Sequence, residues 1–321
     1  MHIDLKLGLS CNNSCRHCIM EPTRLGLIHQ QHDLDSTYEC IESLIDTFSE
    51  NSINSVTLTG GEPTLRKDFF QILHKLTLTN ISVTVQTNGR ILSTDNSLHL
   101  LSQLPHRNVL FVIALHSSSR SIHDTITQKN GSFDETTLAI KKLTELGFPL
   151  SGKMVLSNYN INDINSTLNL MHTLGIKDAI VAYPHAEDFT KDALYNILPR
   201  YYQVRQSLMY YQEKSDFPVF YETIPFCCLP NQNFFKSSID LDYLKMHLTS
   251  SEIIIEMTMI DKQIKWEESR KSIKLKTQKC NLCLLSSICE GAWAEYYDIF
   301  NDEDLIPITD PNIVEIFINS L

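Results

Sequence analysis

Several features are absent from this 321-residue sequence, and each absence narrows the range of functions. No run of about 18 consecutive apolar residues occurs, so we expect no membrane-spanning helix. The first residues alternate apolar and polar side chains, unlike a secretion signal, so we expect a cytoplasmic protein. No strongly basic patch offsets the net charge of −11, which disfavours a nucleic-acid partner. The short lysine run from Lys271 to Lys279 is expected to be a solvated face beside a metal site.

Nine cysteines are present, and without a secretion signal they indicate metal or redox use rather than disulfides. Cys11, Cys15 and Cys18 form a C-x3-C-x2-C motif. Soft thiolates at this spacing suit an iron–sulfur cluster, and three of them leave one iron of a [4Fe–4S] cluster open to a small molecule. A zinc site with His17 as its fourth ligand, or three unrelated thiols, would have the same spacing.

The first ~185 residues alternate strand-like and helix-like segments, which predicts an α/β fold with a parallel sheet. Six βα units predict a partial (β/α)6 barrel of the TIM type. The expected strands are 3–9, 55–59, 81–86, 109–115, 151–157 and 178–183, with further extended segments at 217–222 and 251–266. The expected helices are near 37–50, 134–146, 162–174 and 190–214. The first helix should start with a capping box from Ser36 to Glu39 and should bury Cys40.

Glycine and polar residues follow three of the expected strands. GGEPTL begins at Gly60, QTNG begins at Gln86, and HSSS begins at His116. Because the carboxyl ends of parallel strands meet at one edge of a sheet, we expect these motifs to share a site. Together with CNNSCRHC, and in this order, GGEPTL and QTNG resemble the motifs of the radical S-adenosylmethionine (SAM) enzymes.

The resemblance implies that Cys11, Cys15 and Cys18 hold a catalytic [4Fe–4S] cluster whose open iron binds SAM. The reduced cluster would cleave SAM to a 5′-deoxyadenosyl radical that abstracts hydrogen from a substrate, and flavodoxin or ferredoxin would supply the electron. The SAM-binding residues implied by the resemblance are His17, Gly60, Gly61, Glu62, Asn88 and Ser117. Further candidates for the SAM and substrate site are Ser118, His116, His185, Val155 and Leu156.

Simpler interpretations of these residues stay open. Asn88 could form an ordinary turn with Gly89. Ser117 to Ser119 could cap the following helix. His116 and His185 could be structural, and Asp124 has no expected catalytic role.

A second cysteine set lies near the C-terminus and comprises Cys280, Cys283 and Cys289, with Cys227 upstream. Four thiolates suit structural zinc and iron–sulfur equally well. The C-x2-C-x5-C spacing resembles the SPASM and twitch extensions, which bind auxiliary [4Fe–4S] clusters. Further SPASM cysteines are missing, one of them near Trp293, so we expect one auxiliary cluster. Neighbours on an extended chain point to opposite faces, so we expect Cys227 and not Cys228 as a ligand.

These expectations divide the chain into a radical SAM core at 1–215 and an auxiliary-cluster domain at 216–321. Twitch and SPASM enzymes often modify peptides, so the predicted function is hydrogen abstraction from a peptide or protein. Two alternatives stay open. One is the same chemistry on a small molecule, such as a sugar, nucleotide or cofactor precursor, and the other is a zinc-stabilised binding protein without catalysis. Cys228 would be either a hydrogen-atom donor to a substrate radical or an inert buried thiol.

Overall fold

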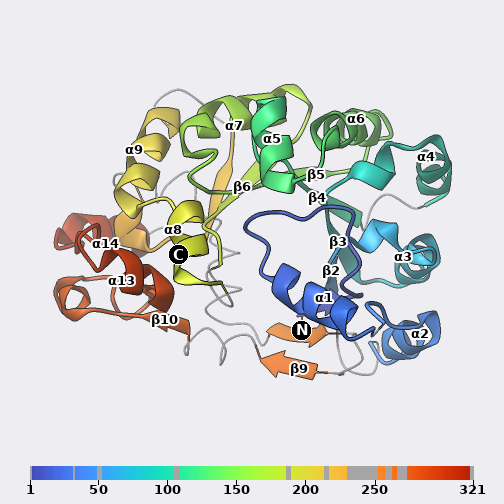
Figure 1. The fold of residues 1–321 in the computed structure, drawn as a ribbon, viewed down its shortest axis with the longest axis horizontal. Coiled ribbons are helices and arrows are strands. Elements are labelled where there is room, and N and C mark those ends of the chain that lie inside the picture. The colour runs from blue at the N-terminus through green and yellow to red at the C-terminus, as the bar shows by residue number, and fades with distance from the viewer. Residues whose placement is uncertain are drawn as a thin grey trace.

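The computed structural model describes residues 2–31, 33–48, 53–104, 109–185, 189–212, 217–229, 252–256, 262–265 and 273–318. A curved nine-stranded sheet lies at the centre, and helices cover its outer face (Figure 1). The strands are β1 (His2–Lys6), β2 (Ser55–Thr59), β3 (Ser82–Thr87), β4 (Val109–Ala114), β5 (Leu150–Val155), β6 (Asp178–Ala182), β7 (Val219–Glu222), β8 (Glu252–Glu256) and β9 (Lys262–Lys265).

The strand order is β7-β6-β5-β4-β3-β2-β1-β8-β9, and every neighbouring pair is parallel except β8 and β9. The six predicted strands all form, and the partial barrel of the TIM type is confirmed. The segment at 217–222 contributes β7, which extends the parallel sheet beyond β6. The extended segment predicted at 251–266 contributes two strands, β8 and β9, and the residues between them lie outside the described residues.

The strand sequences explain the buried sheet. β4 reads VLFVIA and has no alternation of apolar and polar residues, which is typical of a parallel strand that is covered on both faces. Phe111 and Ile113 of β4 are fully buried, as are Val85 of β3 and Leu58 of β2. The core therefore continues across neighbouring strands and holds their carboxyl ends in fixed positions.

The helices are α1 (Met20–His29), α2 (Tyr38–Asp46), α3 (Phe69–Thr77), α4 (Asp95–Ser102), α5 (Arg120–Thr127), α6 (Ser132–Glu145), α7 (Ile164–Thr173), α8 (Lys191–Ile197), α9 (Tyr201–Gln212), α13 (Ala294–Phe300) and α14 (Pro311–Ile318). Gly147 and Gly175 follow α6 and α7 with φ of +79° and +92°, a left-handed conformation in which glycine commonly ends a helix. No helix among the described residues is long and apolar enough to cross a bilayer.

Three local predictions about helices were wrong. The single helix expected near 190–214 is divided into α8 and α9, because Pro199 between them lacks an N–H and clashes with a continuing helix. The N-cap of α2 is Thr37 rather than Ser36, and its hydroxyl accepts a hydrogen bond from the Cys40 N–H. Cys40 is exposed rather than buried, so it lies on the outer side of this amphipathic helix.

The C-terminal segment packs against α8 and α9 at one end of the curved sheet (Figure 1). Arg200, which precedes α9, makes a two-pronged ion pair with the buried Asp304, with N–O distances of 2.9 and 3.0 Å. Arg205 of α9 donates to the backbone oxygens of Cys227 and Asp304 at 2.7 and 3.0 Å. These contacts fasten the second cysteine set to the barrel.

Candidate active site

A cavity of about 290 Å³ lies at the carboxyl ends of the barrel strands. Cys11, Cys15 and Cys18 line one side of it, and Gly60, Gly61, Glu62 and Asn88 line the adjoining side. His17, His116, Val155 and His185 also line the cavity. The structure thus brings together the cysteine motif and the residues after β2 and β3, as expected for strand-end motifs.

The cysteine loop is held from two sides. Near α5, the backbone N–H groups of Ser14 and Arg16 donate to Thr127 and Ile126 at 3.0 and 2.9 Å. On the other side, Arg90 donates to the Asn12 carbonyl and to the Asn13 side chain at 2.6 and 2.9 Å.

The three cysteines of this loop are partly exposed, and the partial burial of their thiols raises all three pKa values, that of Cys11 to about 11. Without a metal, these cysteines therefore keep their protons, and metal binding must release them. Three thiols that converge on one cavity, with space beside them, fit a three-cysteine [4Fe–4S] cluster and a ligand on its open iron.

Gly60 and Gly61 pack directly against the chain that leads into the cysteine loop. A Cβ atom on Gly60 would lie 2.3 Å from the Gly8 carbonyl oxygen, and one on Gly61 would lie 2.3 Å from the Ser10 carbonyl oxygen. Gly60 also has φ +117°, which other residues rarely adopt. Both positions therefore require glycine for this backbone contact, in addition to any approach to SAM.

Glu62 is buried, and its carboxylate accepts four hydrogen bonds. The donors are the backbone N–H and hydroxyl of Thr64, the hydroxyl of Thr87 and the backbone N–H of Asn88. Burial raises the pKa of Glu62, and these hydrogen bonds oppose that rise. Glu62 therefore joins the loops after β2 and β3 beside the cavity.

Asn88 makes a turn contact, which was one of its two expected roles, and its role in binding SAM stays a prediction. Its side-chain oxygen accepts from the Arg90 N–H at 3.1 Å, which is a turn contact. Its side-chain nitrogen donates to Asn12 at 2.8 Å, and the residue also lines the cavity. The turn therefore positions the cysteine loop.

The histidines at the cavity are held in neutral form by burial. Burial lowers the pKa of His17 to about 4, and burial together with His17 and His123 lowers that of His116. A ring nitrogen from each of His17 and His116 and the sulfur of Cys15 lie within 4.8 Å of one another. The two histidine rings therefore lie directly beside the Cys15 thiol.

Ser117 and Ser118 do not line the cavity. Ser117 is fully buried and donates to Asp163, and Ser118 donates to the same carboxylate through both its N–H and its hydroxyl at 2.8 Å. Ser119 is the N-cap of α5, but its side chain makes no capping bond. Leu156 is buried outside the cavity, whereas its neighbour Val155 lines it.

Two charged lining residues were not singled out from the sequence, namely Lys153 of β5 and Glu222 of β7. Their side chains form an ion pair of 2.6 Å, and Ala182 of the intervening β6 lines the cavity between them. A charged residue in an otherwise apolar strand such as LSGKMV was the available signal, because a buried parallel strand seldom carries one without function or pairing.

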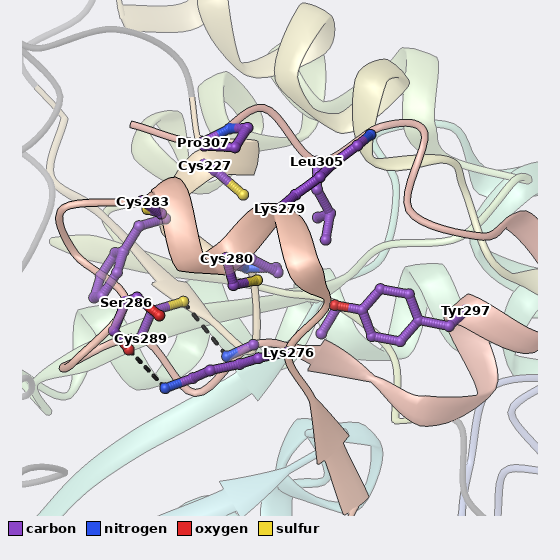
Figure 2. A pocket seen from close by; sticks show the side chains of 14 residues that line it. Cys227, Lys276, Lys279, Cys280, Cys283, Ser286, Cys289, Tyr297, Leu305 and Pro307 are labelled. Carbon is purple, nitrogen blue, oxygen red and sulfur yellow. Dashed lines mark hydrogen bonds between the residues drawn. The ribbon is translucent and has the colours of Figure 1, made fainter. Parts of the chain in front are cut away.

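A second pocket gathers the C-terminal cysteines. Cys227, Cys280, Cys283 and Cys289 line it, and Figure 2 shows their side chains extending into it from separate segments. Cys228 is fully buried in the barrel core, and neither described cavity includes it. The chain at 226–228 is a 3-10 turn rather than extended, yet the two neighbouring thiols still face different surroundings. Four convergent thiols fit a cluster or a zinc ion.

The lysine run departs only in part from the expected solvated face beside a metal site, since Lys276 is exposed but Lys274 is buried. Lys274, in β10 (Lys274–Leu275), is buried, pairs with Glu290 and lies 5.0 Å from the ring centre of Trp293 in β11 (Ala292–Trp293). Lys276 and Lys279 line the cysteine pocket (Figure 2). Lys271 lies outside the described residues.

Comparison with known proteins identifies the class. The model of the radical SAM superfamily matches residues 5–171, which is more than half of the chain. The chain therefore belongs to the radical SAM superfamily, and the prediction of an enzyme of this class is confirmed. Membership implies a [4Fe–4S] cluster and SAM as cofactors, which the convergent cysteine loop fits.

Three curated relatives illustrate the range of similarity. The chain is 27% identical over 191 residues to the subtilosin biosynthesis protein AlbA of Bacillus subtilis. It is 29% identical over 211 residues to a probable GTP 3′,8-cyclase of Pyrococcus horikoshii, and 28% identical over 143 residues to the mycofactocin maturase MftC of Mycolicibacterium smegmatis. These matches cover 59%, 62% and 44% of this chain, and 40%, 62% and 34% of the relatives.

Solved structures share the fold over nearly the whole chain. SuiB of Streptococcus suis aligns with a TM-score of 0.63 and 14% identity, and covers 95% of this chain and 77% of its own. The structure of anSMEcpe with bound AdoMet aligns with a TM-score of 0.64 and 16% identity. The alignment covers 99% of this chain and 96% of anSMEcpe. At these identities the likeness establishes a common fold.

Proposed function

We propose that this enzyme cleaves SAM reductively and abstracts hydrogen from a peptide or protein. The core would comprise residues 1–215, and an auxiliary-cluster domain would comprise 216–321. Cys11, Cys15 and Cys18 would hold the catalytic cluster, with SAM beside His17, Gly60, Gly61, Glu62 and Asn88. Ser117 would act indirectly, through Asp163. An electron donor such as flavodoxin or ferredoxin is required, and the nine free thiols suit the reducing cytoplasm.

The charge of the residues that line the cavity supports a peptide or protein as the substrate. Among the described residues that line it, Lys153 provides the cationic charge, and its ion pair with Glu222 neutralises that charge. A lysine donor beside a carboxylate acceptor matches the C=O and N–H of a peptide group. The same pair offers no excess positive charge for a nucleoside triphosphate. The names of AlbA and MftC, as biosynthesis protein and maturase, are consistent with a peptide.

The protein's own contribution is positioning and exclusion of water. When bound, the reduced cluster and SAM supply the radical that removes hydrogen. Glu62 and Asn88 hold the strand-end loops against the cysteine loop, and Arg90 fixes that loop from the other side. Buried neutral histidines and the backbone of Gly60 and Gly61 would enclose the nucleoside.

A second candidate is the same chemistry on a small molecule. The similarity to the probable GTP 3′,8-cyclase, over 62% of both chains, favours it. The neutralised charge around Lys153 argues against a phosphorylated substrate of this kind.

Anaerobic reconstitution with iron and sulfide, followed by SAM and a reductant, tests the proposal. Two clusters give roughly eight irons per chain, and one cluster with zinc gives about four. Release of 5′-deoxyadenosine is expected, and its yield should rise on adding peptides encoded beside this gene but not on adding GTP. Stimulation by GTP and not by peptides would support the small-molecule alternative instead. Zinc without iron would contradict both.

A further inference from the structure

His116 is held in one orientation directly after β4. Its side chain lines the cavity, although only 3% of the residue is exposed. The buried Asn160 donates to the His116 carbonyl at 2.8 Å, and the His116 N–H donates to Nδ1 of His123 at 3.2 Å. The His116 backbone is therefore fixed at both its N–H and its carbonyl group.

The hydrogen bonds also fix which ring nitrogen of His116 carries the proton. Nδ1 of His116 accepts from the Val155 backbone N–H at 3.4 Å. A backbone N–H can only donate, so Nδ1 is the unprotonated nitrogen of this neutral ring. The remaining nitrogen, Nε2, therefore bears the hydrogen and is a donor rather than a metal ligand.

This ring lies beside the cysteine loop. The centres of the His116 and His17 rings are 4.7 Å apart in an edge-to-face arrangement, and ring nitrogens of both lie within 4.8 Å of the Cys15 sulfur. None of the described residues hydrogen-bonds the buried Nδ1 of His17. Imidazole nitrogens thus converge on the place where a cluster bound to Cys15 would present its sulfurs.

We propose that His116 is a positioning residue for the N-terminal cluster, with its Nε2–H hydrogen-bonded to a sulfur at the Cys15 corner. A donor to a cluster sulfur stabilises the more negative, reduced state and raises the reduction potential. The inference depends on the proposed function, because it requires the cluster at Cys11, Cys15 and Cys18.

The test uses the reconstituted full chain labelled with 15N-histidine, reduced and without SAM. A Cys280→Ser background removes the signal of the second site. Pulsed EPR should detect a 15N coupling to the N-terminal cluster that disappears in His116→Met. We expect His116→Met to lower the reduction equilibrium constant about tenfold, which corresponds to 59 mV for one electron. His116→Gln, which keeps an N–H donor, should restore most of the potential but not the 15N coupling.

His172→Gln is the matched control, because His172 stacks on Phe217 outside the cavity, and it should leave coupling and potential unchanged. The inference is overturned if the labelled wild-type protein shows no coupling, or if the coupling persists in His116→Met and disappears in His17→Phe. The wild-type measurement needs no variant to fold. A chain that binds no iron would overturn the proposed function as well, and the iron count reveals that before any EPR.

Discussion

The two cysteine sites of this chain are built in different ways. The N-terminal site takes its three thiols from one short loop, which backbone groups of α5 and the side chain of Arg90 hold in place. The second site takes three thiols from one segment, Cys280, Cys283 and Cys289, and the fourth from the distant Cys227, whose carbonyl accepts a hydrogen bond from Arg205. The first site is thus specified locally, whereas the second depends on how the C-terminal segment packs on the barrel.

Removing a thiol from the local site should have the largest effect. Cys15→Ser replaces a soft ligand by a hydroxyl that holds iron poorly. We expect 5′-deoxyadenosine formation to fall to background and iron to fall by about four per chain. Cys40→Ser is the matched control, because Cys40 is exposed on α2, and it should retain full activity. Retained SAM cleavage in Cys15→Ser would show that the loop does not hold the catalytic cluster.

Removing a thiol from the second site should distinguish the function of this site from that of the N-terminal site. In Cys280→Ser we expect loss of the metal at the second site, with the N-terminal cluster and SAM cleavage without substrate retained. Modification of the substrate should be lost. Metal analysis also shows whether the lost metal is about four irons or one zinc.

Cys228→Ala is the neighbouring control for that experiment, because Cys228 is buried outside the cysteine pocket. This variant should keep all of its metal. It should lose only the small amount of folding stability that is expected for a small substitution in the core. Loss of metal in Cys228→Ala would show that the ligand is Cys228 rather than Cys227. Full turnover of the native substrate in this variant would exclude a hydrogen-donor role for Cys228.

The sequence predicted the parts of the site that depend on local pattern. Strand-end motifs such as GGEPTL had to meet at one edge because parallel strands align their carboxyl ends. Cys11, Cys15 and Cys18 follow β1 at a spacing that a single loop can gather around a metal. Among the predicted strands, β4 is an apolar run that is largely buried, whereas β1 and β3 alternate buried and more exposed positions, and both patterns indicate a strand.

Features that depend on tertiary packing could not be predicted in the same way. The Lys153–Glu222 pair joins β5 and β7 across β6, and the sequence does not specify that separation. Ser117 faces Asp163 rather than the cavity because the loop after β4 turns toward α7, which the motif HSSS does not indicate. Cys40 was misplaced because helical spacing defines an apolar face only to within a residue or so.

Substitution of two arginines compares the two cysteine sites more finely, and we expect effects of intermediate size. Arg90→Met removes the donors to Asn12 and Asn13, and Arg205→Met removes the donor to Cys227 and Asp304. Each leaves partly buried acceptors unpaired, which costs about 1–3 kcal/mol. We expect Arg90→Met to weaken iron retention at the N-terminal site and Arg205→Met to weaken retention at the second. Equal loss from both sites in either variant would indicate general destabilisation.

The smallest expected effect does not involve catalytic activity. It is a difference between individual thiols in the pH at which they react. In the metal-free chain burial raises the pKa of Cys11 to about 11, whereas the hydrogen bond from Cys228 lowers the pKa of Cys227. Only the thiolate reacts with iodoacetamide, so Cys227 should be alkylated at a lower pH than Cys11.

Peptide mapping by mass spectrometry between pH 6 and 11 measures the midpoint of each reaction. The midpoint separates acidity from access, because restricted access slows a reaction at every pH but does not move the midpoint. If Cys11 and Cys227 share one midpoint, the two sites do not differ in acidity. A lower midpoint for Cys227 means that metal binding displaces fewer protons from this cysteine than from Cys11.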